Sequence, residues 1–268
     1  MSQKSHPPKG LVHQSKSLQA FQLATHNAPS DLAEVVDYFW TVTWDLAPGK
    51  EYVQANLPHP VCHIVVDPQQ GSGFFTPARG AFSYRLSGRG GVLGARIKPG
   101  MARAFHPGSL AHLGTVPVAL DGIDFGVLED HLRVANAPND IIPDFAQQLR
   151  NIAAPPCAVA KKTGALVIHA QVNPDILRAE ALAQVAGMSL RQLQRLFSAH
   201  IGVGPKWVID RFRMLEALAA LNAGGHVDLA DLSARLGFTD QPHFSARFKT
   251  LTGTSPARYL RAQGMHRA

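Results

Sequence analysis

The spacing of apolar and polar residues changes near residue 156. Before that point, apolar residues come in short runs rich in β-branched and aromatic side chains, separated by Gly, Pro, Asn or Asp. Such runs predict the short strands of a β-sandwich or barrel. Helices are expected to interrupt the strands at 31–36 and 142–151. The clearest strand candidates are 36–44, 61–66 and 90–97.

After residue 156, the apolar residues recur at spacings of three and four, which predicts helices. Pro155-Pro156 mark the change, because proline favours extended chain over helix. One long helix is expected over 205–223, since Pro205 suits a first helical turn and Gly224-Gly225 would end the helix. At about 1.5 Å per residue, this helix is roughly 28 Å long.

One supersecondary unit occurs twice in the helical half, within residues 178–200 and 228–250. Each copy predicts a short helix, a tight turn at glycine and a second helix that a polar side chain caps. The expected caps are Ser189 in the first copy and Thr239 or Asp240 in the second. Two helix-turn-helix units indicate a protein that binds double-stranded DNA at two places. The repeated residues are Gly187-Met188-Ser189, Phe197, Gly202 and Pro205, then Gly237-Phe238-Thr239, Phe248, Gly253 and Pro256.

Polar side chains suited to DNA lie on the outer faces of these helices. Arg can form two hydrogen bonds to guanine and Gln can form two to adenine, while Lys and Arg attract phosphates. Leu193 and Phe197 are expected to face inward, so Arg191 and Arg195 are expected to face outward. The candidate DNA-binding residues are Ser189, Arg191, Gln192, Gln194 and Arg195, then Lys206 and Arg211 with Arg213 nearby, and finally Gln241, His243, Arg247 and Lys249.

The positive charge of the chain is confined to the helical half. The formal net charge is +7; residues 1–156 hold 12 Lys and Arg against 12 Asp and Glu, whereas residues 157–268 hold 14 against 7. A basic excess alone is equally typical of an ordinary solvated surface. Together with the doubled helix-turn-helix, it favours a surface that binds DNA phosphates.

Two further stretches match the sequence pattern of a known family at many positions. Gln194-Arg195-Leu196-Phe197 is one, and the run from Gly237 to Ser245 is the other. With them, about residues 165–262 resemble the DNA-binding domain of the AraC/XylS transcriptional regulators. The first half resembles, more weakly, the cupin-like sensor domain of one branch of that family. The cues there are Tyr38-Phe39-Trp40, Leu57-Pro58, Gly94-Ala95-Arg96 and Lys98-Pro99-Gly100.

The resemblance implies different roles for the two units. Arg191, Gln194 and Arg195 fall where members of the family contact bases. In the second unit, Ala246 stands where Arg is frequent, and Pro242 brings no polar side chain to the start of the helix. The second unit is therefore expected to grip phosphate, through its helix N-terminus and Lys249.

Enzymatic alternatives find little support in the residues. A cupin metal site needs a His-x-His pair, and none of the 13 histidines forms one. His59, Cys62 and His63 are close in sequence, but neighbours on a strand face opposite ways, so no metal site is expected. Two cysteines are too few for the four-cysteine zinc site of related DNA-repair proteins. No catalytic residue or cofactor is expected; the alternatives are a ligand-independent architectural DNA-binding protein and a cupin-type metal enzyme fused to a DNA-binding domain.

The expected fold class is α+β, with a β-rich cupin-like domain followed by an all-α domain. The expected divisions are a disordered tail at 1–19, a sensor or dimerisation domain at 20–156 and the DNA-binding domain at 157–268. The expected partners are double-stranded DNA, a small-molecule effector and RNA polymerase, for a monomer or homodimer in the cytoplasm without a membrane segment. Aromatic residues of the barrel that could line an effector pocket are Trp40, Phe74, Phe75, Phe82 and Tyr84, although core packing is the expected role for most of them.

Overall fold

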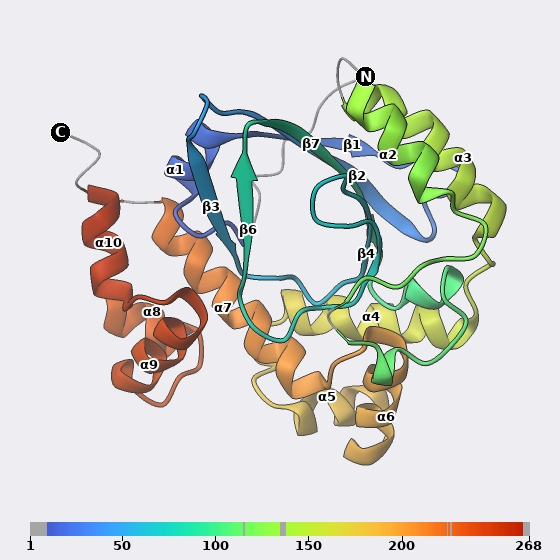
Figure 1. Cartoon of the computed structure of the whole chain (residues 1–268). Helices are drawn as coiled ribbons and strands as arrows, with labels where there is room; N and C mark the ends of the chain where they lie inside the picture. Colours follow the sequence, from blue (N-terminus) through green and yellow to red (C-terminus); the bar gives the residue numbers. More distant parts are fainter. Residues whose placement is uncertain (1–9, 115, 135–137, 224, 226, 265–268) are drawn as a thin grey trace.

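The computed structural model describes residues 10–114, 116–134, 138–223, 225 and 227–264 (Figure 1). As the predicted α+β class requires, the first half is built on antiparallel strands and the second half is helical. A five-stranded sheet has the order β1-β2-β7-β4-β5, and β3 pairs with β6 in a second sheet. The strands are β1 (Gln22–Asn27), β2 (Val36–Asp45), β3 (Glu51–Asn56), β4 (His63–Val66), β5 (Gly73–Phe75), β6 (Phe82–Ser87) and β7 (Arg89–Ile97).

The five-stranded sheet has apolar side chains on both faces, because alternate residues of each strand point to opposite sides. On the outer face, Phe39 packs edge-on against Phe145 in the core that helices α2 (Phe125–Val134) and α3 (Ile142–Ile152) close (Figure 1). On the inner face, Trp44 and Val92 pack with Leu86 of the opposite sheet. The first half is therefore a two-sheet structure with helices on one side.

The helices of this half differ from the sequence expectations in two places. The predicted helix at 31–36 is wrong, because residues 31–35 form turns and Val36 already pairs with Ile97 of β7. The helix α2 was not predicted, whereas α3 confirms the stretch at 142–151. Short 3-10 helices complete the half: η1 (Met101–Ala104), η2 (Leu110–His112) and η3 (Pro138–Ile141).

The expected disordered tail at 1–19 is wrong for residues 10–19. Leu11 bridges Asn56 at the edge of β3, and the Val12 N–H donates to the Ala55 carbonyl at 3.1 Å. Helix α1 (Gln14–Ala20) follows. The two apolar side chains Leu11 and Val12 are buried, which the polar composition around them concealed. Residues 1–9 lie outside the described part of the chain.

The helical half forms around one central helix, α7, as its Pro205 start predicts (Figure 1). Val208 and Ile209 of α7 enter the core of the first helix-turn-helix unit, and Met214 and Leu218 enter the core of the second. The expected stop at Gly224 lies outside the described residues. The helices are α4 (Ala158–Val172), α5 (Ala179–Ala186), α6 (Leu190–Ile201), α7 (Pro205–Ala223), α8 (Leu229–Arg235), α9 (Gln241–Thr252) and α10 (Pro256–Gly264).

Helix α4 joins the two halves. Ala160, near its start, belongs to the outer core of the first half, whereas Val167 belongs to the core of the first helix-turn-helix unit. The backbones touch closely: a Cβ on Gly164 would lie 2.3 Å from the Pro99 carbonyl oxygen, and one on Gly100 would lie 2.5 Å from that of Ala160. Only glycine fits at these two positions, so the halves share a packed boundary.

Candidate nucleic-acid interface

The first helix-turn-helix consists of α5, a turn and α6, and local sequence signals fix each part. Gly187 ends α5 with φ of 64°, the left-handed conformation expected of it. The predicted cap is confirmed, because the Ser189 hydroxyl accepts from the Gln192 N–H at 3.3 Å. The Gln192 side-chain oxygen in turn accepts from the Ser189 N–H at 2.8 Å. This reciprocal capping box satisfies donors at the start of α6.

Helix α6 buries Leu193 and Phe197 completely, which turns the opposite face to solvent. Arg191, Gln194 and Arg195 are exposed. Within the described part of the chain, these three side chains form no hydrogen bond or ion pair, so their donors are available to a ligand. Ser189 and Gln192 are also exposed, but their side-chain oxygens are occupied by the capping box. They therefore position the start of the helix.

The second helix-turn-helix repeats this architecture with different capping chemistry. Asp228 caps α8 through its carboxylate, which accepts from the N–H groups of Ala230 and Asp231. The turn has Gly237 with φ of 68°. Of the two caps expected for α9, the structure selects Asp240, whose carboxylate accepts from the His243 N–H at 2.7 Å.

The outer face of α9 is poor in base-reading side chains. Phe244 and Phe248 are fully buried, and the side opposite them presents Pro242 and Ala246. Lys249 is exposed there as well. The remaining candidates lie to either side of this face. Gln241 and His243 are exposed at the start of the helix, and Arg247 is half-buried with its guanidinium 3.8 Å from the Asp210 carboxylate.

Arg211, a candidate from the sequence, does not lie on a DNA-accessible surface. Its side chain is buried; a terminal nitrogen donates to the Arg79 carbonyl at 2.9 Å, and the guanidinium stacks 4.5 Å from the Trp207 ring centre. Burial, with a further contribution from Arg247, lowers the pKa of Arg211 to about 10. Because Trp207 also donates to the Arg79 carbonyl, at 3.1 Å, both side chains fasten α7 to the first half.

The other two cations of α7 have separate environments. Lys206 is exposed at the start of the helix. Arg213, expected near phosphates, instead turns inward and donates to the Leu236 carbonyl at 2.5 Å. The sequence showed that these residues lie on one helix, but not which neighbour each would meet.

The space between the two sheets of the first half is filled by side chains. The Trp40 indole N–H donates to His63 Nδ1 at 3.1 Å, and the ring covers Gly94, where a Cβ would lie 2.2 Å from it. Tyr84 donates to the Asp67 carboxylate at 2.8 Å. Of the named aromatic residues, Phe74 packs in the outer core, whereas Phe82 is 45% exposed.

His63 and Cys62 face opposite ways, as neighbouring residues of an extended chain should. His63 contacts Trp40 on the inner side, whereas Cys62 packs into the outer core. Burial, assisted by Arg96 and His59, lowers the pKa of His63 to about 3, and burial raises the pKa of the Cys62 thiol. Among the residues that the structure describes, no three His, Cys, Asp or Glu side chains are grouped as a metal site requires.

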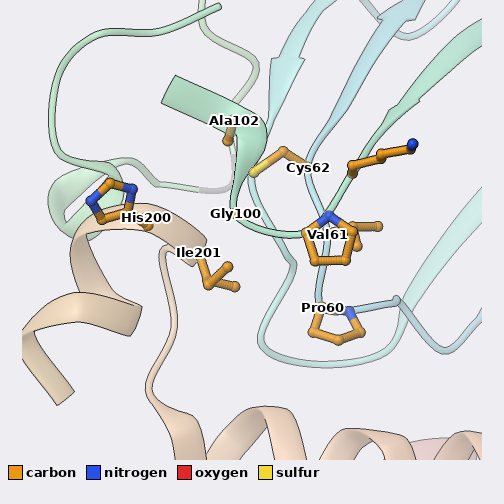
Figure 2. A pocket seen from close by; sticks show the side chains of 9 residues that line it. Pro60, Val61, Cys62, Gly100, Ala102, His200 and Ile201 are labelled. Carbon is orange, nitrogen blue, oxygen red and sulfur yellow. The ribbon is translucent and has the colours of Figure 1, made fainter. Parts of the chain in front are cut away.

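A small pocket lies where the end of α6 meets the first half. Figure 2 shows His200 and Ile201 on one side of it and Cys62, Gly100 and Ala102 on the other. His200 is 5% exposed, its Nδ1 atom has no hydrogen-bond partner, and its Nε2 atom lies 3.5 Å from an Arg103 nitrogen. The pocket therefore lies at the contact between the first helix-turn-helix unit and the sheet domain.

Two separate parts of the chain match known family models. Residues 182–262 match the family model of a helix-turn-helix domain, and residues 24–116 match a domain of unknown function (DUF6597). The transcriptional activator RhaS of Salmonella arizonae is 34% identical over 77 residues, which are 29% of this chain and 27% of that protein. The chain thus spans about a quarter of the length of the curated relatives that it matches.

Two solved structures illustrate the likeness. An AraC-type regulator from Chromobacterium violaceum shares 25% identity over 40% of this chain and 96% of its own, with a TM-score of 0.36. ToxT from Vibrio cholerae shares 12% identity over 90% of this chain and 98% of its own, with a TM-score of 0.38. None of the described helices has the length and apolar character that crossing a membrane requires.

The class of the helical half follows from its geometry: it is a DNA-binding domain with two helix-turn-helix units on one central helix. In sequence, this domain matches the helix-turn-helix family model, and the chain is similar to the transcriptional activator RhaS over 77 residues.

Proposed function

We propose that this protein is a sequence-specific DNA-binding transcriptional regulator whose first helix-turn-helix unit reads bases. The observation that carries the proposal is the outer face of α6. Arg191, Gln194 and Arg195 are exposed there, without internal partners, on a helix that the capping box and the buried Leu193 hold in place. A rigid helix with free Arg and Gln donors suits the edges of base pairs in a major groove.

The second unit is proposed to hold the sugar-phosphate backbone. Lys249 is exposed on α9, and Gln241 and His243 flank the start of the helix, where backbone N–H groups attract phosphate. Lys206 at the start of α7 adds a cation between the units. Ser189 and Gln192 would support the reading helix, and Arg247 would approach DNA only at the side of α9. Arg211 is left out of the interface because it is buried.

The first half is proposed to regulate DNA binding in response to a small molecule. Its support is the packed boundary, since η1 and η2 contact α6 and the Arg79 carbonyl holds α7. A change of shape in the sheet domain would therefore reach both the reading helix and the central helix. We further propose that the protein acts in the cytoplasm as a monomer or homodimer and contacts RNA polymerase. The proposal includes no enzymatic activity.

Capture of genomic DNA fragments by the purified full-length protein tests the proposed function. We expect the captured fragments to share a short sequence, and the logarithm of their affinity to fall linearly with the logarithm of the salt concentration. Binding of all fragments with the same affinity would support an architectural DNA-binding protein instead. An absence of DNA binding at low salt would contradict both functions.

A further inference from the structure

The middle of α7 holds the turn of the second helix-turn-helix unit. The Nε of Arg213 donates to the Leu236 carbonyl at 2.5 Å, and its guanidinium carbon lies 4.0 Å from the centre of the Phe238 ring. Leu236 and Phe238 flank Gly237 in the turn between α8 and α9. One side chain thus contacts both ends of the turn that aims α9.

Asp210 adds a second connection from the same helix. One of its carboxylate oxygens lies 3.6 Å from Arg213, and the other lies 3.8 Å from Arg247 on α9. The Asp210 and Arg213 side chains are 27% and 15% exposed, so these charges are only partly screened by solvent. The carboxylate therefore links the central helix to the second recognition helix as well as to Arg213.

The connection between α4 and α5 contacts the same turn. Leu177, in the connection between α4 and α5, lies so close to Gly237 that a Cβ there would be 2.5 Å from the Leu177 side chain. The corresponding glycine of the first unit, Gly187, has open space around its Cβ position. A neighbouring side chain therefore closes in on the glycine of the second turn but not on that of the first turn.

We propose that Arg213 is a positioning residue that sets the number of base pairs between the two DNA contact regions. Asp210 and Leu177 assist it by holding α9 and the turn before it. The inference rests on the proposed function, because it concerns how two bound units are held relative to each other. Successive major grooves lie about 34 Å apart, and the central helix spans roughly 28 Å. One inserted base pair shifts the second contact region by about 3.4 Å and rotates it, so a rigid domain must reject wrong spacings.

The test measures affinity of the full-length protein for duplexes that carry its preferred site with zero, one or two base pairs inserted between the contact regions. We expect the wild-type protein to lose roughly tenfold or more per insertion. Arg213→Ala should bind the duplex of native spacing about tenfold more weakly than the wild-type protein does. Its affinities for the three duplexes should differ from one another by less than about threefold. Arg213→Lys keeps the charge but loses the forked pair of donors, so its preference for spacing should lie between those of the wild-type protein and Arg213→Ala.

The matched control is Arg235→Ala, which removes an exposed Arg of α8 whose ion pair is with Asp231 of the same helix. It should keep the wild-type preference for spacing. Thermal melting shows whether each variant is folded; Asp210→Asn, at a half-buried position, serves as the second variant and should also weaken the preference. The positioning role is contradicted if folded Arg213→Ala loses the same factor at every spacing, or loses nothing. A wild-type protein without any preferred duplex would instead contradict the proposed function.

Discussion

The two recognition helices share their buried faces and differ on their exposed ones. Positions 51 residues apart correspond, so Phe197 of α6 matches Phe248 of α9, and both are fully buried. On the exposed faces, however, Arg195 corresponds to Ala246. Arg191 likewise corresponds to Pro242. Packing requires the shared residues, whereas reading DNA depends on the residues that differ.

The two units are also attached differently to the rest of the molecule. The end of α6 contacts η1 and η2 of the first half. The second unit is tied through α10, where Tyr259 accepts from the His13 N–H at 2.6 Å and donates to Asn222 at 2.6 Å. The His13 and Tyr259 rings stack 4.4 Å apart. Each unit can therefore respond to a different part of the sheet domain.

The largest effect is expected from breaking the helix that both units share. Leu215→Pro removes a backbone hydrogen bond in the middle of α7 and disrupts a buried position, at a cost of about 3 kcal/mol or more. Specific binding should be lost while weak phosphate affinity remains, and a footprint of about 20 base pairs should disappear. Glu216→Ala, at the exposed neighbouring position, is the control. Unchanged specificity in Leu215→Pro would show that the units work separately.

The next largest effect is expected from exchanging Arg195 of α6 and Ala246 of α9, which occupy corresponding exposed positions. Arg195→Ala should weaken binding to the preferred site by about 1–3 kcal/mol and relax the choice at one or two base pairs. The reverse exchange, Ala246→Arg, should add a base preference in the second contact region. Fluorescence anisotropy with duplexes substituted at single positions measures both changes. An equal loss on all sequences in Arg195→Ala would argue against base reading.

A pH effect should distinguish the first unit from the second. His200 corresponds to Leu251, and burial together with Arg103 lowers the pKa of His200. In the unfolded chain the imidazole takes up a proton near pH 6.5, whereas in the folded protein it does so only at lower pH. The contribution of the neutral ring to the free energy of unfolding is therefore present above about pH 6.5 and is lost as the pH falls below it. The loss is at most about 1.4 kcal/mol per pH unit.

Melting of the wild-type protein and of His200→Leu at pH 7.5 and 5.5 checks this expectation. Arg103 on η1, with a guanidinium nitrogen 3.5 Å from His200 Nε2, opposes a protonated imidazole. The variant should lose less stability on acidification than the wild-type protein does. Identical losses would show that His200 takes up its proton freely in the folded state.

The smallest effect is expected at Lys249. Lys249→Ala removes one exposed cation from α9, so it should weaken binding to all sequences alike and lower the salt slope by roughly one unit. Titrations at several salt concentrations measure that slope. Lys50→Ala, an exposed cation of the sheet domain, should leave it unchanged. A loss of sequence preference in Lys249→Ala would mean that the second unit reads bases too.

Periodicity and capping chemistry made much of the fold predictable. Alternation and turn residues indicated β2 and β7, and the glycine and hydroxyl signals gave the turn and cap at Gly187 and Ser189. Those signals act within a few residues of each other. They also separated the buried Phe197 from the exposed Arg195, because a helix turns by a fixed angle per residue.

The rest depended on contacts between distant segments. Nothing near Arg211 in the sequence indicates that the Arg79 carbonyl would bury it. Similarly, Val12 enters the core of the second unit from a polar segment. A spacing pattern shows which side of a helix is buried, but not which partner covers it. The partners that the sequence did not reveal lie on other elements, from Leu236 for Arg213 to the Arg79 carbonyl for Arg211.

Selection from a library of random duplexes with the full-length protein is the most direct test of the difference between the units. The account predicts strong base preferences in the region that α6 contacts, weak preferences about one helical turn away, and a fixed spacing between them. Arg195→Ala should erase preferences only in the first region. Equally strong preferences in both regions, or preferences that survive Arg195→Ala unchanged, would contradict the claim that the first unit reads and the second holds.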